Sequence, residues 1–149
     1  MLEGLLRAII SGFLGAAGFG ALLHAPRKGV LWGSVIGAVG YTAYWLIFHL
    51  TGSELPAMFV GALLAAALGQ IAARKLHMIS TVFVTIAILP LVPGIGLFRS
   101  MSALGQGDMA QGASLAAHAM SLILMIVMGT GIGSALFSIR RPAVKEELH

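Results

Sequence analysis

The sequence predicts an all-α integral membrane protein, a bundle of about five transmembrane helices that forms a single membrane domain over residues 1–149. Three observations lead to this fold class. The chain is 58% hydrophobic, only 9% of its residues are charged, and its apolar residues gather in five long runs. Soluble domains usually contain about 25% charged residues, and a chain this short cannot hide so much apolar surface from water. We therefore expect membrane lipid to surround most of the chain.

The five apolar runs are each long enough to cross a bilayer as a helix, which takes about 20 residues. Arg7 is the only Asp, Glu, Lys or Arg residue within them. The runs are apolar all round and lack the alternation of apolar and polar residues that is typical of a membrane β-barrel. Helices are therefore favoured over strands. The predicted spans are residues 5–23, 30–50, 55–73, 78–98 and 114–139.

The connections between the runs are short, apart from a polar segment of residues 99–113 that we expect to be a loop. With five spans, seven of the nine Lys and Arg residues fall at one set of helix ends. Cytoplasmic loops carry an excess of these residues, so we expect a multi-pass protein of the cell inner (plasma) membrane with its N-terminus outside and its C-terminus in the cytoplasm. The seven are Arg27, Lys28, Arg74, Lys75, Arg140, Arg141 and Lys145, against Arg7 and Arg99.

Small residues recur every four positions along four of the runs, which places them on one face of each helix. Such faces allow close backbone approach, which holds helices together in lipid. Because these smooth faces exceed what a small bundle needs, we expect some of them to meet another subunit. The rows are Gly12, Ala16 and Gly20; Gly29, Gly33 and Gly37; Gly61, Ala65, Gly69 and Ala73; and Ala113, Ala117, Ser121, Gly129 and Gly133.

The fourth run carries a Pro-x-x-Pro-Gly motif that predicts a break in its helix. Pro90 and Pro93 each remove a backbone donor and clash with the preceding turn, while Gly94 and Gly96 permit unusual dihedral angles or close contacts. We expect the break near Pro93 and Gly94. This point lies about 24 Å along a helix that starts at Met78 and rises ~1.5 Å per residue, and therefore in the outer half of the membrane.

A broken membrane helix exposes backbone groups that transporters use to bind their substrates. Arg99, beyond the break, is a candidate partner for a substrate carboxylate. It is alternatively an interfacial arginine whose side chain reaches the outer surface. The candidate substrate-binding residues are Pro90, Pro93, Gly94, Gly96, Arg99, Ser100 and Thr85.

His118 in the fifth run is either a proton acceptor or a helix-to-helix hydrogen-bond partner. All five acidic residues lie at helix ends or in loops, so we expect any proton carrier to sit on a partner subunit. The sequence has no cysteine, no His and carboxylate pattern with metal-ligand spacing, and no nucleophile beside a base. We therefore expect neither enzymatic activity nor a cofactor. The absence of a basic run with interleaved aromatics argues against nucleic acid as a partner.

Around the proline motif the chain resembles the threonine/serine exporter (ThrE) family, and more closely the small, separately encoded C-terminal half of that family. The similar segments are residues 81–95 (TVFVTIAILPLVPGI) and residues 18–41, where GFGALLHAPR is followed by Trp32-Gly and by IGAVGY. The positions that carry over are Pro90, Pro93 and Gly94; Arg99 is not one of them.

This resemblance implies a subunit of a secondary exporter of threonine, serine or a related small carboxylate such as succinate, driven by the proton gradient. It also implies a larger membrane subunit of the same family as partner. Two other function classes stay open: a structural or assembly subunit without its own transport path, and a homo-oligomeric channel whose pore the break would line. A neighbouring gene for a several-span protein with buried acids would favour the exporter.

Overall fold

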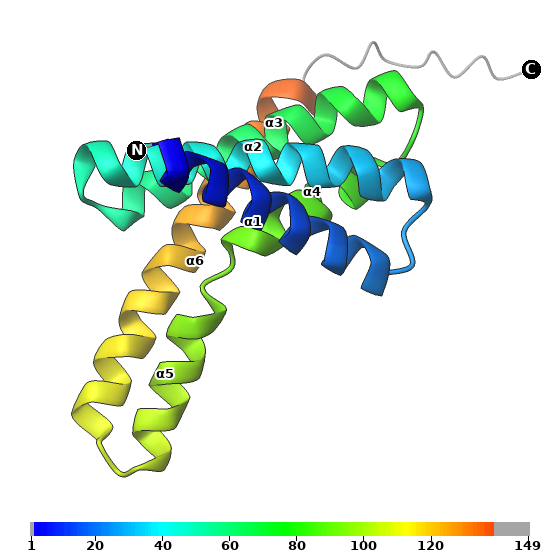
Figure 1. The fold of residues 1–149 in the computed structure, drawn as a ribbon. Coiled ribbons are helices and arrows are strands. Elements are labelled where there is room, and N and C mark those ends of the chain that lie inside the picture. Colours follow the sequence, from blue (N-terminus) through cyan, green and yellow to red (C-terminus); the bar gives the residue numbers. More distant parts are fainter. Residues whose placement is uncertain (1, 139–149) are drawn as a thin grey trace, which may run out of the picture.

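The computed structural model describes residues 2–138, which fold into helices joined by short turns (Figure 1). Among the described residues, four helices are long and apolar enough to cross a membrane. A bent pair of shorter helices brings the number to five if the pair counts as one span. The predicted fold class, an all-α membrane protein of about five spans, is therefore confirmed. The elements are α1 (Leu2–Leu22), α2 (Arg27–Thr51), α3 (Glu54–Leu76), α4 (Ser80–Ile88), the 3-10 turn η1 (Leu89–Leu91), α5 (Gly94–Gly105) and α6 (Met109–Ser138).

The helices α1, α2 and α3 pack in sequence order, and α4 packs against both α2 and α3. α6 runs along α3, and α5 packs on α6, so that α5 and the N-terminal part of α6 form a hairpin projecting from the other helices (Figure 1). One buried cluster joins α2, α3 and α4 around Phe83. A second joins α3 and α6 around Leu91 of η1. The break between α4 and α5 therefore lies against the core of the bundle.

The turns between the helices follow from a few residues with suitable backbone chemistry. α2 ends at Gly52, whose φ of 67° lies in the left-handed region, and its N–H donates to the Phe48 carbonyl at 2.8 Å. Glycine is the usual residue at this position because it has no Cβ to clash. Before α6, the Asp108 Oδ1 accepts a hydrogen bond of 3.0 Å from the Gln111 N–H. This is a side-chain cap of the kind that starts helices.

The expected loop over residues 99–113 is wrong, because most of this segment is helical. α5 continues to Gly105 and α6 begins at Met109, which leaves only residues 106–108 as a turn. Gly107 supplies the turn with a φ of 85°, and the Asp108 cap starts the next helix at once. The polar residues of this segment therefore mark the tip of a helical hairpin, and α6 starts five residues before the predicted span.

The rows of small residues bring the helices into backbone contact. A Cβ placed on Gly37 would lie 2.8 Å from the Ala16 Cβ, so α1 and α2 meet through their small faces. A Cβ on Gly40 would lie 3.1 Å from the Gly61 carbonyl oxygen, which joins α2 to α3 in the same way. On α6, a Cβ on Gly129 would lie 2.5 Å from the Phe59 carbonyl oxygen of α3. The predicted packing faces are thus used within the chain.

The expectation of surplus smooth faces for another subunit is not supported by this packing. The rows of α1, α2 and α3 are buried inside the bundle, as are Gly129 and Gly133 of α6. The outer part of the α6 row differs, because Ala113 and Ala117 are exposed on the projecting hairpin. The count of small residues overestimated the surface left free for another subunit, because most of these faces pack against a neighbouring helix of the same chain.

The orientation of the bundle in the membrane stays a prediction. The basic pair that opens α2 and the basic pair that closes α3 lie at the same end of these helices, where Trp32 and Lys75 line one groove. Arg140, Arg141 and Lys145, which also support the predicted orientation, lie outside the described residues.

The contact between α3 and α6 can be tested with one added methyl group. Gly129→Ala should lower the free energy of unfolding by about 1–3 kcal/mol, because its Cβ meets backbone that cannot swing away. Gly131→Ala is the matched control on the same helix, since nothing lies within 4 Å of its Cβ. Thermal unfolding of the purified protein in detergent measures both. Equal midpoints for the two variants would contradict the close α3–α6 contact.

Candidate functional site

The fourth span is broken between η1 and α5, and the helices on its two sides differ in direction by 54°. The Gly94 N–H donates to the Val92 carbonyl at 2.8 Å, across Pro93 with φ −76° and ψ 59°. These angles are those of an inverse γ-turn, a common way to leave a regular element. The Val92 N–H donates to the Leu89 carbonyl at 3.2 Å and closes the 3-10 turn. The bend is thus made by a tight turn centred on Pro93.

Neither glycine of the motif takes the unusual dihedral angles that the sequence suggested. The described glycines with positive φ are Gly52 and Gly107, whereas Gly94 and Gly96 lie in the first turn of α5 with ordinary helical geometry. Gly96 packs against α6, where an added Cβ would lie 3.7 Å from the Ala119 Cβ, an ordinary van der Waals contact. The ψ angle and missing N–H of Pro93 are sufficient to turn the chain.

The side of the break before Pro93 is held by neighbouring helices. Leu91 is only 2% exposed and packs with Met58 and Ala62 of α3 and with Leu122 of α6. Pro90 faces α1, where a Cβ on Gly15 would lie 3.7 Å from its ring. Irregular backbone at membrane depth is tolerated where protein buries it. The surrounding helices meet that condition at Leu91, whereas Val92 and Gly94 are exposed.

Beyond the break, Arg99 and Ser100 occupy different surroundings on α5. Ser100 is buried, and its hydroxyl donates to the Gly112 carbonyl of α6 at 2.9 Å. This bond ties the two helices of the hairpin together, so the hydroxyl is already engaged. Arg99 is exposed, and within residues 2–138 no acidic side chain lies within 4.0 Å of its guanidinium. Of the two residues, Arg99 is therefore the one available to a substrate anion.

Thr85 lies on the other side of the break and lines a groove of about 350 Å³ beside the α1–α2 connection. The groove also carries the Thr81 hydroxyl and the His24 ring, and its remaining lining is Leu23, Ala25, Pro26, Val82 and Ile86. None of the other six candidate residues lines this groove. The structure thus separates the candidates into Thr85 before the break, the proline turn itself, and Arg99 beyond it.

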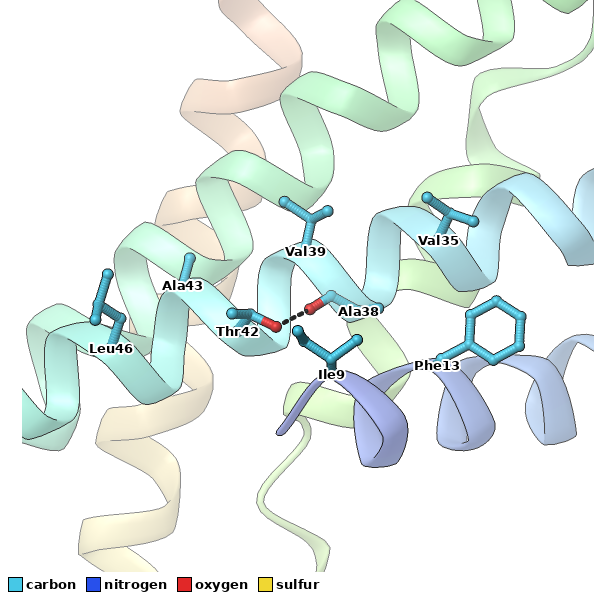
Figure 2. A pocket seen from close by; sticks show the side chains of 8 residues that line it. All are labelled: Ile9, Phe13, Val35, Ala38, Val39, Thr42, Ala43 and Leu46. Atoms are coloured by element: carbon cyan, nitrogen blue, oxygen red, sulfur yellow. Dashed lines mark hydrogen bonds between the residues drawn. The ribbon is translucent and has the colours of Figure 1, made fainter. Parts of the chain in front are cut away.

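A larger groove of about 500 Å³ lies between α1 and α2 and is almost wholly apolar (Figure 2). Ile9 and Phe13 of α1 line it together with Val35, Val39 and other α2 side chains (Figure 2). The hydroxyl of Thr42, its one polar side chain, donates to the Ala38 carbonyl at 2.7 Å. A polar ligand would find no free donor among these side chains, so this groove suits lipid chains rather than an amino acid.

One polar contact of the structure was not foreseen as a pair. The His118 Nε2–H of α6 donates to the Glu54 Oε2 of α3 at 2.9 Å. The sequence offered no signal for this pairing, because the partners are 64 positions apart and only the packing of α3 on α6 brings them together. The alternative reading of His118 as a helix-to-helix hydrogen-bond partner agrees with this geometry.

The fold defines a multi-pass membrane protein whose fourth span is bent at a break. A family model described as "Threonine/Serine exporter, ThrE" matches residues 8–136. The chain therefore belongs to the threonine/serine exporter (ThrE) family, whose members are exporters rather than enzymes. No solved structure matches the chain.

The hairpin bond can be tested by removing its donor. Ser100→Ala should destabilise the α5–α6 hairpin by about 1 kcal/mol, because the buried Gly112 carbonyl loses its side-chain donor. Hydrogen exchange of the α5 amides should then become several-fold faster. Ser114→Ala, at an exposed serine of α6, is the matched control. Unchanged α5 protection in the Ser100 variant would show that this bond does not hold the hairpin.

Proposed function

We propose that this chain is one component of a two-component secondary exporter in the cell inner membrane, which moves threonine, serine or a related carboxylate such as succinate out of the cell in exchange for protons. The observation that carries the proposal is the family match over residues 8–136. The broken fourth span supports it, because such breaks supply backbone groups for substrate binding in transporters.

The break also suggests how the two sides of the membrane become accessible in turn. α4 packs on α2 and α3, whereas the contacts of α5 are with α6. The segments before and after Pro93 therefore belong to different neighbours, and a change in the 54° bend would move one group against the other. Alternating access by rigid movement around a fixed point is the usual mechanism of secondary transporters.

The polar groups on the two sides of the break suit successive positions of a small amino acid. The Thr81 and Thr85 groove lies at the end of the bundle predicted to face the cytoplasm. Its hydroxyls can receive the substrate's polar groups. Beyond the break, the N–H groups of Ile95 and Gly96 in the first turn of α5 and the Arg99 guanidinium favour the carboxylate. The substrate would thus pass from the groove, along the proline turn, toward Arg99.

The proposed partner is the larger membrane subunit of the same family. The resemblance to the separately encoded C-terminal half supports it, and so does the span number, because five spans cannot divide into two matching repeats. A partner would complete the path on the side of the break that this chain leaves open, where Gly94 and Arg99 are exposed.

Straightening the break should abolish export without preventing insertion. The double variant Pro93→Ala/Gly94→Ala restores a backbone donor and favours a continuous helix, so the two halves of the span can no longer move separately. Efflux of threonine, serine and succinate from cells that express both subunits measures the effect. The expected result is loss of efflux with an unchanged amount of the chain in the membrane.

The matched control is Pro56→Ala, which replaces an exposed proline in the first turn of α3, on a different helix from the break. Efflux by this variant should equal that of the unmodified exporter. If the double variant also exports at the unmodified rate, the broken span is not the substrate site.

Removing the Arg99 guanidinium should weaken substrate binding. Arg99→Ala should raise the substrate concentration for half-maximal efflux about tenfold or more, because a charge-assisted hydrogen bond contributes about 1.5–3 kcal/mol. Arg99→Lys should give an intermediate value, since it keeps the charge but loses the two-pronged geometry. Arg7→Ala, at an exposed arginine of α1, serves as control. If the half-maximal concentration is unchanged in Arg99→Ala, Arg99 does not bind substrate and is an interfacial arginine.

A further inference from the structure

Within residues 2–138, two side-chain hydrogen bonds join positions more than four residues apart in the chain. Ser100 bonds to Gly112 inside the hairpin, and His118 bonds to Glu54 between α6 and α3. The second is also the one salt-bridge contact of this part of the chain. Since apolar side chains give no preference for a neighbouring helix over lipid, a polar link between two spans has unusual influence on how they sit together.

The pair lies at the end of α3 opposite to Arg74 and Lys75, and so at the end predicted to face outside. Glu54 stands in the first turn of α3, where the helix dipole favours a carboxylate. His118 precedes Ala119, which approaches Gly96 at the start of α5. The pair therefore sits where the projecting hairpin leaves the bundle, one residue from the contact with the broken span.

Both partners are partly exposed, at the end of the bundle predicted to face outside. The side chains of His118 and Glu54 are 58% and 38% exposed. Nε2 of His118 bonds to Glu54, and within the described residues its Nδ1 has no hydrogen-bond partner. A neutral imidazole that donates from Nε2 therefore presents the Nδ1 lone pair to a proton from outside. Histidine is the side chain that ordinarily changes charge between about pH 5 and 8.

We propose that Glu54 and His118 form an outward-facing proton site, which acts as a latch between α3 and α6 and closes when a proton binds to His118 Nδ1. The inference rests on the proposed exporter function, and it places a proton acceptor on this chain rather than only on the partner subunit. The proton converts a neutral imidazole beside a carboxylate into an imidazolium–carboxylate pair, so the net charge of the pair changes from −1 to zero.

That change in charge favours the closed arrangement. An imidazolium attracts the Glu54 carboxylate electrostatically, whereas a neutral imidazole carries no charge to do so. Both the donor and the acceptor of the hydrogen bond then carry charge, which makes the bond stronger. Deeper in the membrane, Gly129 and Gly133 keep α3 and α6 in backbone contact. The two helices can thus separate at the outer end while they stay joined below it.

Other titratable and charged groups on the packed elements do not replace either partner. The Tyr44 hydroxyl of α2 lies within the electrostatic field of the Glu54 carboxylate, and Tyr44 packs on the core beside it. His49 of α2 is bonded to its own helix through Trp45. The remaining groups are Tyr41 beside Tyr44, Arg99 on α5, Asp108 before α6, and the basic pairs Arg27, Lys28, Arg74 and Lys75 at the opposite ends of α2 and α3.

The latch sets the sequence of events at the outer face, where substrate release comes before proton binding and closure. Substrate leaves while the outer end is open and His118 is neutral. A proton then binds from outside, and the pair draws α3 and α6 together in the arrangement that the structure shows. Closing the outer end only after proton binding couples the return of the carrier to the proton gradient.

The first test measures efflux against pH in proteoliposomes that contain both subunits, with equal pH on both sides and the membrane potential fixed. Threonine, serine and succinate are each assayed. The unmodified exporter should change its rate about threefold or more between about pH 5.5 and 8.5, a range that covers most of the interval in which histidine ordinarily changes charge. His118→Gln and Glu54→Gln should each flatten this profile to less than about 1.5-fold.

Two controls separate the latch from general damage. His49→Gln removes a histidine in the last turn of α2 that is bonded within its own helix. The pH profile of this variant should match that of the unmodified exporter. The exchanged variant E54H/H118E keeps the pair with its partners reversed and should recover a pH-dependent profile. A His118→Gln exporter with the unmodified profile would overturn the proposal.

The second test does not depend on transport. Because the chain has no cysteine, Ser53→Cys/Ala117→Cys places two spin labels at exposed positions beside Glu54 and His118. Their dipolar broadening in the assembled complex should weaken as pH rises from about 5.5 to 8.5, because the latch opens. Adding His118→Gln should remove this change.

The two tests fail in different ways. No efflux of any of the three substrates by the unmodified complex would contradict the proposed function, while the spin labels would still decide whether the latch exists. Efflux with spin-label spectra that do not depend on pH would overturn the latch and leave the exporter intact.

Discussion

Close backbone contact between small faces is the constraint on which the rest of this bundle depends. In lipid, large apolar side chains do not drive helices together, so packing relies on surfaces that let backbones meet. The contacts of Gly37 with Ala16, and of Gly129 with the Phe59 carbonyl, leave no room for even one methyl group. This packing fixes the positions of α3 and α6, and these two helices in turn hold Leu91 and place the break.

The break is useful because it is firmly placed but joined to two different neighbours. Leu91 and Pro90 anchor its inner side on α3, α6 and α1, whereas α5 continues on α6 alone among the regular contacts of the fold. Pro93 therefore sits between a fixed segment and a segment that belongs to the hairpin. In the exporter proposed above, the movement that exchanges access between the two sides would take place here.

Sequence patterns predicted the spans well because lipid imposes a simple rule of length and polarity. They failed at residues 99–113, where Gln106 and Asp108 suggested a long loop but belong to a tight turn between helices. They also failed to show that most of the small faces pack against other helices of the same chain. Sequence patterns could not predict the Glu54–His118 pair, because a contact across 64 positions depends on how whole helices pack. Among the candidate residues, only the structure shows that the Ser100 hydroxyl is already hydrogen-bonded and that Thr85 lines a separate groove.

The central claim is that this chain and a larger partner together exchange a small amino acid or carboxylate across the membrane. Counterflow of labelled threonine, serine or succinate into proteoliposomes preloaded with the same unlabelled compound measures this most directly. We expect transient accumulation of label with both subunits present and none with either subunit alone. Absence of counterflow for all three compounds, in vesicles shown to contain both folded subunits, would contradict the account.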